Sequence, residues 1–254
     1  MALKTTDTGR VRILSINRPD ALNAMNNAVF SSIRDGLDAA AADPGVAVVV
    51  LTGEGRAFCA GQDLTEMLAG GEEHQFPSML ERLATFPKPL VAAVNGLGVG
   101  IGMTILGHCD LALMADTARL RTPFPQLGLA PEAGSSATFA SVMGWQNAAH
   151  VLLTGRWFSA EECHEMGLVW KVCTADSLMD ETMQVAQEIA ANPIPSLIAT
   201  KKLMLAAGKT EAVLAAHNRE LVAYQPLMGG AANREAVAAF TEKREPDFSA
   251  IPGL

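Results

Sequence analysis

Four short segments of the chain are apolar at nearly every position, and segments with a helical period lie between them. The four are residues 11–16 (VRILSI), 46–51 (VAVVVL), 90–94 (LVAAV) and 111–114 (LALM). Runs of this length that are apolar on both faces are typical of strands in a mostly parallel sheet covered by helices. The pattern therefore predicts an α/β fold.

Helices are predicted where apolar residues recur every three or four positions, in residues 26–42 and 77–85. Ser159 followed by Glu162 has the spacing of a capping box, which predicts a third helix that ends near Gly167.

The pattern becomes entirely helical from about residue 176, with prolines at 193 and 195 as breaks. We expect a core domain with the active site in residues 1–192 and a helical oligomerisation region in residues 193–254.

Composition narrows the class of protein. The 254 residues are 49% hydrophobic and 18% charged, which is ordinary for a globular protein with a large core. The net charge of −8, without long runs of like charge, argues against nucleic acid or an anionic membrane as partner. No signal peptide or run of 18 apolar residues is present, so we expect a cytoplasmic protein with four reduced cysteines.

A glycine-rich segment, residues 94–102 (VNGLGVGIG), follows one predicted strand and leads into an apolar helix. This arrangement places backbone N–H groups at a helix N-terminus, where negative charge is favoured. The glycines do not have the GxGxxG spacing of a nucleotide-binding turn. Tight packing of helix against strand is the alternative explanation.

A second turn follows another predicted strand, in residues 53–64 (GEGRAFCAGQDL). Its small residues Ala60 and Gly61 let a flat ligand lie close to the backbone. The two turns could therefore direct N–H groups at one oxygen atom, and the long polar segment 53–78 is expected near the active site.

Glu132 is the strongest candidate for a general base, because it lies among apolar and small residues (LGLAPEAGSS). Desolvation there raises the pKa of a carboxyl group toward the useful range. The alternative is a carboxylate placed only to favour a helix N-terminus.

Other candidates for chemistry are weaker. The five histidines lack HExxH spacing, so no metal site is expected. Ser135 and Ser136 lack the GxSxG elbow of serine hydrolases. Tyr224, in the helical C-terminal region, is interpreted as structural.

Several segments together resemble the crotonase (enoyl-CoA hydratase/isomerase) family. They occur in the family's order, from LSINRPDALNAM and AFCAGQDL through PLVAAVNGLGVGIGMTILGHCDLAL and TPFPQLGLAPEAGSS to LLTGRWFSAEECHEMGLVWKV and AAFTEKREPDF. The resemblance implies a ClpP-like spiral of repeated β-β-α units with a C-terminal helical appendage, assembled as a trimer or a dimer of trimers. It implies an acyl-CoA substrate and no separate cofactor.

The resemblance also implies roles for individual residues. Two backbone N–H groups, those of Gln62 and Ile101, correspond to the family's oxyanion hole, although most relatives have glycine at the second position. Contacts with coenzyme A correspond to Ala60, Gln62, Asp63 and Leu64, and on the phosphate side to Arg18, Ala21 and Leu22.

Departures from the family pattern point to a subclass. Hydratases of the family use two glutamates, and the corresponding residues here are Thr104 and Phe124. Glu132 instead lies in a segment similar to that carrying the single catalytic glutamate of Δ3,Δ2-enoyl-CoA isomerases. That reaction is therefore expected, with Met103, Phe124 and Leu127 as an apolar wall around the acyl chain.

Two alternatives remain open. One is a hydratase or acyl-CoA hydrolase that uses one glutamate. The other is a noncatalytic acyl-CoA-binding or RNA-associated homologue, which the acidic balance and the intact base disfavour.

Overall fold

A six-stranded sheet forms the centre of the protein, in a computed structural model that describes residues 1–63, 66, 74–249 and 251. Its strand order is β1-β2-β3-β5-β7-β10; β1 and β2 form an antiparallel hairpin, and the remaining neighbours are parallel. The strands are β1 (Leu3–Thr8), β2 (Val11–Ile16), β3 (Val48–Gly53), β5 (Leu90–Val94), β7 (Leu111–Ala115) and β10 (Lys171–Cys173).

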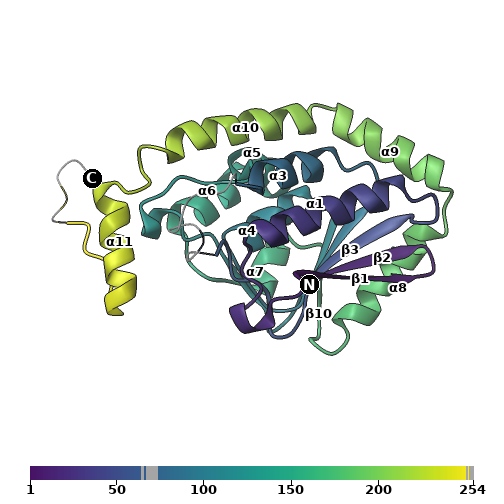
Figure 1. Ribbon diagram of the computed structural model, residues 1–254, viewed down its shortest axis with the longest axis horizontal. Helices are drawn as coiled ribbons and strands as arrows, with labels where there is room; N and C mark the ends of the chain where they lie inside the picture. The colour runs from purple at the N-terminus through teal and green to yellow at the C-terminus, as the bar shows by residue number, and fades with distance from the viewer. Residues whose placement is uncertain (64–65, 67–73, 250, 252–254) are drawn as a thin grey trace.

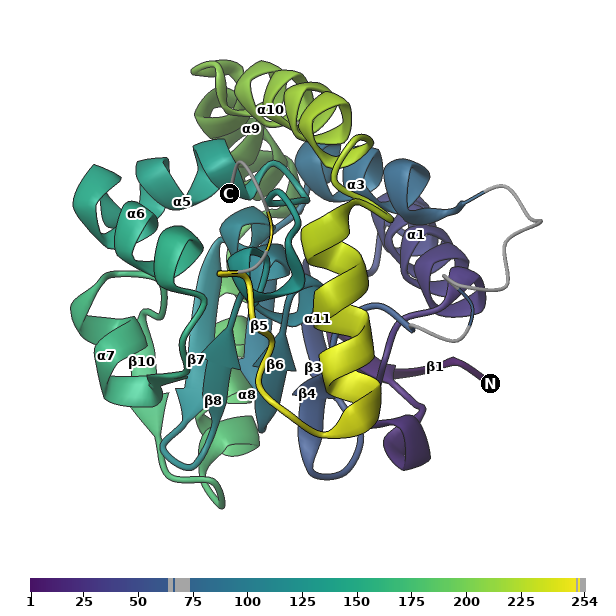
Figure 2. The same cartoon turned by 90° about the vertical axis from the view of Figure 1, so that its left-hand side faces the viewer.

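A smaller sheet of order β4-β6-β8-β9 lies at the ends of the central strands (Figure 2). It contains β4 (Ala57–Cys59), β6 (Leu97–Val99), β8 (Arg119–Arg121) and β9 (Phe158–Ser159). Three successive pairs, β3 and β4, β5 and β6, β7 and β8, give one strand to each sheet, and each pair is followed by a helix. This repetition is the predicted spiral of β-β-α units.

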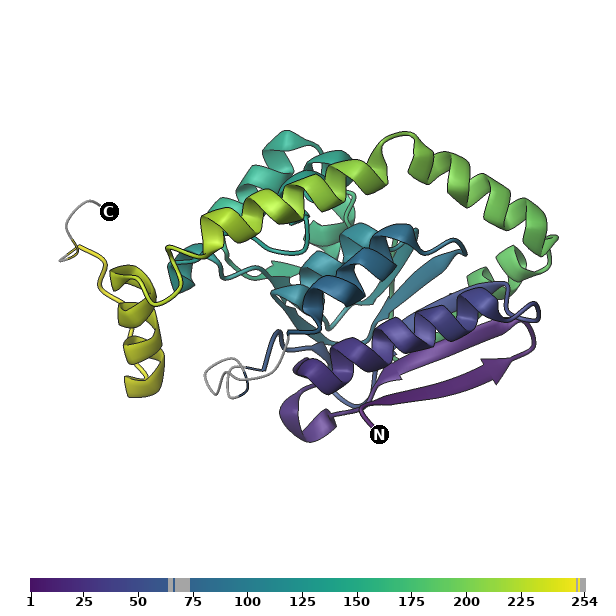
Figure 3. The ribbon, with the colours of Figure 1, turned by 45° about the horizontal axis from the view of Figure 1, so that its top comes forward.

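Helices cover both faces of the central sheet. In Figure 1, α1 (Asn27–Ala42) lies above the strands and α8 (Leu178–Ala190) lies below them. In Figure 3, α3 (Phe76–Thr85) lies beside α1. The structure also describes, up to residue 165, α4 (Ile101–Thr104), α5 (Ser135–Met143), α6 (Trp145–Thr154) and α7 (Ala160–Glu165), with 3₁₀ turns η1 (Pro19–Ala21), η2 (Ile105–His108) and η3 (Pro125–Leu127).

The C-terminal helices form an arm across the top of the molecule. Helix α9 (Ile194–Ala206) is followed by α10 (Lys209–Tyr224), which lies over α3 and α5, and α11 (Ala231–Glu242) stands at the far end (Figure 1). Among the described helices, none combines the length and apolarity needed to cross a bilayer.

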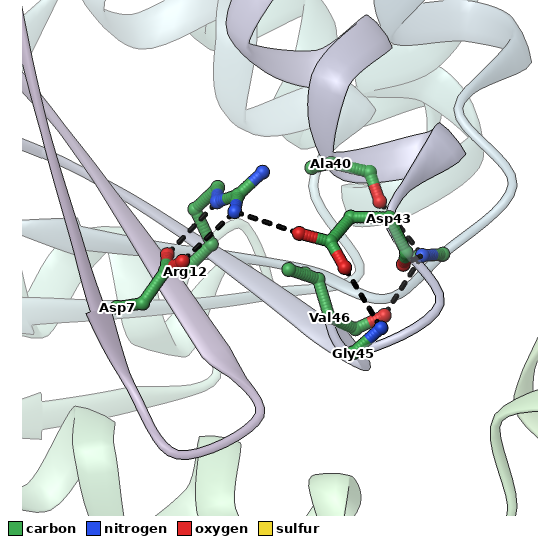
Figure 4. Close-up of polar contacts among 7 residues, drawn as sticks. Asp7, Arg12, Ala40, Asp43, Gly45 and Val46 are labelled. Carbon is green, nitrogen blue, oxygen red and sulfur yellow. Dashed lines mark hydrogen bonds and ion pairs between the residues drawn. The ribbon is translucent and has the colours of Figure 1, made fainter.

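A charged cluster closes the turn between α1 and β3. The guanidinium of Arg12 donates to the carboxylates of Asp7 and Asp43 (Figure 4). The ammonium of Lys88, only 1% exposed, donates to the carbonyl oxygens of Ala40, Asp43 and Val46. A cation at a helix C-terminus is electrostatically favourable, so these contacts hold the end of α1 beside the start of β5.

The four predicted strands and the two long predicted helices are confirmed, with ends that agree within two residues. The capping box is also confirmed: Ser159 accepts from the Glu162 N–H and the Glu162 carboxylate accepts from the Ser159 N–H. The sequence pattern missed the smaller sheet, because its strands contain only two or three residues and alternation cannot be recognised over that length.

Candidate active site

Glycines bring the two turns predicted from the sequence into direct contact. A Cβ atom at Gly102 would lie 2.2 Å from the carbonyl oxygen of Cys59, and one at Gly61 would lie 3.2 Å from that of Val99. Only glycine permits the first of these approaches. The explanation by tight packing is therefore correct for Gly102, and this packing places the start of α4 against the end of β4.

Two backbone N–H groups at these turns are available to a ligand. Within the described part of the chain, the N–H groups of Gln62 and Ile101 have no hydrogen-bond acceptor. The preceding glycines, Gly61 with φ of 104° and Gly100 with φ of 53°, have positive φ values that favour glycine. Ile101 as a whole residue is 1% exposed and its side chain packs in the core, so the proposed contact would involve its backbone N–H and not its side chain.

The carboxylate of Glu132 faces the same turn. Its Oε1 atom would lie 3.6 Å from a Cβ atom at Gly100, next to the N–H group of Ile101. Burial, together with the negative charge of Glu220, raises the pKa of Glu132 to about 7. A side chain with this pKa can accept a proton and release it again near neutral pH.

The alternative role for Glu132, as a carboxylate serving a helix N-terminus, belongs to Glu220. The carboxylate of Glu220, on α10, accepts from the N–H groups of Gly134 (2.6 Å) and Ser136 (2.9 Å) and from the Ser136 hydroxyl (2.6 Å) at the start of α5. Among the described contacts, the Glu132 carboxylate accepts no hydrogen bond of this kind. Its oxygens therefore remain available for a substrate.

The turn that carries Glu132 is held from two sides. Ala133 has φ of 60°, an uncommon conformation for a residue with a Cβ atom. The Nε2 atom of His108 donates to the Ala133 carbonyl at 2.8 Å, while Glu220 binds the next N–H group, that of Gly134. Burial lowers the pKa of His108 to about 4, so this imidazole is neutral at pH 7. These contacts keep Glu132 in one position.

A cavity of about 260 Å³ opens beside Glu132. Most of its wall is apolar, and the polar groups come from Gln62, His74, Glu132 and three residues of α10. The lining residues are Gln62, His74, Phe76, Pro77, Pro131, Glu132, His217, Glu220, Leu221, Tyr224 and Met228. The cavity therefore takes side chains from both ranges into which the sequence was divided, 1–192 and 193–254.

The residues expected around the acyl chain lie outside the described wall of this cavity. Met103 is fully buried in the core, Phe124 is 5% exposed, and the carbonyl of Leu127 accepts from the side chain of Asn233. These three residues are not among the described lining residues of the cavity.

Sequence reasoning missed the contribution of α10. His217, Glu220, Leu221 and Tyr224 have the i, i+3, i+4, i+7 spacing of one helix face, and all four line the cavity. Tyr224, interpreted as structural, is one of them. The spacing was visible in the sequence, but it could not indicate which part of the molecule this face would cover.

The residues expected to contact coenzyme A lie together. The guanidinium of Arg18 donates to the Asp63 carboxylate at 2.9 Å, and the N–H of Ala60 donates to the Leu22 carbonyl at 3.0 Å. Ala21 ends η1 in the same segment. Leu64 lies outside the described residues.

The remaining reactive side chains of the described residues do not meet the requirements of a metal site. Among the described residues, no group of three or more His, Cys, Asp or Glu side chains is placed to hold a metal ion. The four cysteines are free and buried.

Comparison with known proteins identifies the family. The sequence model of the enoyl-CoA hydratase/isomerase family matches residues 7–250. The 2,3-dehydroadipyl-CoA hydratase and the 1,2-epoxyphenylacetyl-CoA isomerase of Escherichia coli are each 34% identical to the chain, over 94% of its length and 95% of theirs.

Solved structures agree with this assignment. An enoyl-CoA hydratase/isomerase from Pseudoalteromonas atlantica superposes with a TM-score of 0.93 at 34% identity, covering 98% of this chain and 100% of its own. An enoyl-CoA hydratase from Mycobacterium marinum is 49% identical, with a TM-score of 0.78 over 81% of this chain and 99% of its own. The fold, the paired turns and these similarities agree. The chain therefore belongs to the enoyl-CoA hydratase/isomerase family of the crotonase superfamily.

Proposed function

We propose that the protein is a Δ3,Δ2-enoyl-CoA isomerase with Glu132 as its general base. Glu132 removes a proton from C2 of a 3-enoyl thioester, and the double bond moves as the same proton is returned to C4. The enolate oxygen formed between these steps accepts from the N–H groups of Gln62 and Ile101. The observation that carries the proposal is a carboxylate without a capping role beside two available N–H groups.

The rate contributions expected from the two N–H donors and the base are large enough for this reaction. A backbone donor in an oxyanion hole typically lowers the barrier by about 3 kcal/mol. A positioned general base contributes roughly 10²- to 10⁴-fold in rate, most effectively when its pKa lies near the working pH. The pKa of about 7 for Glu132 meets that condition.

Hydration by two carboxylates receives less support. Thr104 is fully buried, and Phe124 supplies no acid or base at the other hydratase position. Glu220 is a second carboxylate in the cavity wall, but its oxygens already accept from three donors at the start of α5. Activation of water by a pair of glutamates would require these contacts to be broken.

Binding of the coenzyme A portion is proposed for the turn formed by Arg18, Ala21, Leu22, Ala60 and Asp63. Arg18 is the cation of this group, and a guanidinium is well suited to phosphate oxygens. The thioester is itself the substrate, so the proposed reaction requires no separate cofactor.

Assembly into a trimer or a dimer of trimers is also proposed. Leu203 and Met204 on α9 and Val222 on α10 are 75%, 59% and 73% exposed. Large apolar side chains exposed on neighbouring helices are typical of a surface covered by another chain.

The test compares 3-hexenoyl-CoA with 2-hexenoyl-CoA as substrates for the purified protein. We expect formation of the conjugated 2-enoyl thioester from the first substrate and little addition of water to the second. Predominant hydration, or release of free coenzyme A, would instead identify a hydratase or a hydrolase. Binding of both thioesters without turnover would identify a noncatalytic homologue.

A further inference from the structure

His217 has no role in the proposed reaction, yet it is a buried polar side chain in the wall of the cavity. The residue is 6% exposed. Within the described part of the chain, neither of its ring nitrogens has a hydrogen-bond partner. A buried polar group without a partner is destabilising, so such a group calls for an explanation.

The neighbours of His217 do not provide the missing hydrogen bonds. The ring of Phe76 lies 5.7 Å from the imidazole, centroid to centroid. Glu220, three residues further along α10, directs its carboxylate to Gly134 and Ser136. A ligand in the cavity is therefore the available partner for the His217 nitrogens.

The charges around the cavity define the kind of group that fits. Burial lowers the pKa of His217, so the neutral imidazole offers one N–H donor and one nitrogen acceptor. The carboxylates of Glu132 and Glu220 line the same cavity. An anionic group on the ligand would be repelled by both, whereas a hydroxyl or carbonyl oxygen would not.

His217 lies in the same cavity wall as the proposed base, where the acyl chain of the proposed substrate would pass. His217 and Tyr224 lie on the same face of α10, seven residues apart, which corresponds to about 10 Å along a helix. The cavity wall they share also contains Glu132, the proposed base, and the apolar side chains of Phe76, Leu221 and Met228.

We propose that His217 is a specificity residue that hydrogen-bonds an uncharged oxygen substituent on the acyl chain, beyond the reacting carbons. The preferred substrates are then hydroxy- or oxo-substituted enoyl thioesters rather than plain fatty acyl thioesters. This inference rests on the proposed function, because it assumes that an acyl-CoA occupies the cavity.

The test measures binding of saturated thioesters that cannot isomerise. Isothermal titration calorimetry compares hexanoyl-CoA with its 4-, 5- and 6-hydroxy derivatives and with adipoyl-CoA, which carries a terminal carboxylate. We expect at least one hydroxy derivative to bind about tenfold more tightly than hexanoyl-CoA, and adipoyl-CoA to bind no better than hexanoyl-CoA.

Variants assign the preference to the imidazole. His217→Phe should abolish the preference for the hydroxy derivative while hexanoyl-CoA still binds within about threefold of wild type. His217→Gln, which keeps a donor and an acceptor, should retain part of the preference. His150→Phe, at an exposed histidine outside the cavity, is the matched control. If the phenylalanine variant does not fold, the glutamine variant still shows whether the preference for the hydroxy derivative depends on residue 217.

The outcomes separate the two proposals. Binding of hexanoyl-CoA without any preference among the hydroxy derivatives overturns the role of His217 alone, as does a preference that survives in both His217 variants. Tighter binding of adipoyl-CoA that depends on His217 overturns the assignment to uncharged groups. Failure of every thioester to bind overturns the proposed function itself.

Discussion

Replacement of Glu132 by glutamine separates the catalytic from the structural consequences of the buried carboxylate. The two side chains have nearly the same size, so the cavity and the contacts of Ala133 and Gly134 should be unchanged. The substitution removes the base and the negative charge. We expect kcat/KM for isomerisation of 3-hexenoyl-CoA to fall by roughly 10²- to 10⁴-fold, the contribution of a positioned general base.

Stability should change in the opposite direction. Folding raises the pKa of Glu132 from 4.5 to about 7, and each pKa unit corresponds to 1.36 kcal/mol. The folded protein binds the proton more tightly than the unfolded chain, so this group lowers stability as the pH rises from about 4.5 to 7. Above pH 7 the ionised carboxylate costs at most about 3 kcal/mol, and glutamine carries no such cost.

The assay combines steady-state kinetics with urea denaturation at pH 8 and pH 5. At pH 8 the free energy of unfolding of Glu132→Gln should equal or exceed that of wild type, and the difference should shrink at pH 5. Glu81→Gln, at an exposed position on α3, is the control and should change neither quantity. Activity within tenfold of wild type, or a clear loss of stability at pH 8, would refute the reasoning.

Two further predictions concern the same site. The isomerisation kcat/KM should rise with pH to a plateau, with a midpoint near the Glu132 pKa of about 7, because the base must be ionised; a rate that falls over this range contradicts the assignment. Gly102→Ala places a Cβ atom 2.2 Å from the Cys59 carbonyl oxygen, so we expect a loss of about 1–3 kcal/mol in unfolding free energy and at least tenfold in kcat. Gly36→Ala, in α1, would meet only the flexible ends of the Leu3 and Leu14 side chains and should stay within about 1 kcal/mol of wild type. Equal effects of the two substitutions would contradict the role of the close contact.

The sequence indicated those parts of the fold and site that depend on neighbouring residues. The four buried strands are visible as apolar runs, and the Ser159 capping box spans only three residues. The apolar surroundings of Glu132 are partly encoded in its own segment. Local pattern was therefore sufficient for four of the six central strands and for proposing Glu132 as the base, whereas β1 and β10 were not predicted.

Features formed between distant segments were not predictable in this way. Glu220 contacts the segment after Glu132 from 84 to 86 residues further along the chain. His108 supports Ala133 across 25 residues. Without an indication of which helix face covers the cavity, neither side chain could be distinguished from ordinary buried polar residues.

Because Glu220 on α10 contacts the start of α5, the site is complete only after both helices have formed. During synthesis, the strands and the segment with Glu132 emerge first, when the wall contributed by α10 does not yet exist. Because domains fold as their residues become available, the nascent chain can form its central sheet well before it has a complete cavity. The proposed reaction is therefore expected only after α10 has packed against α5, because Glu220 then holds the segment that follows Glu132.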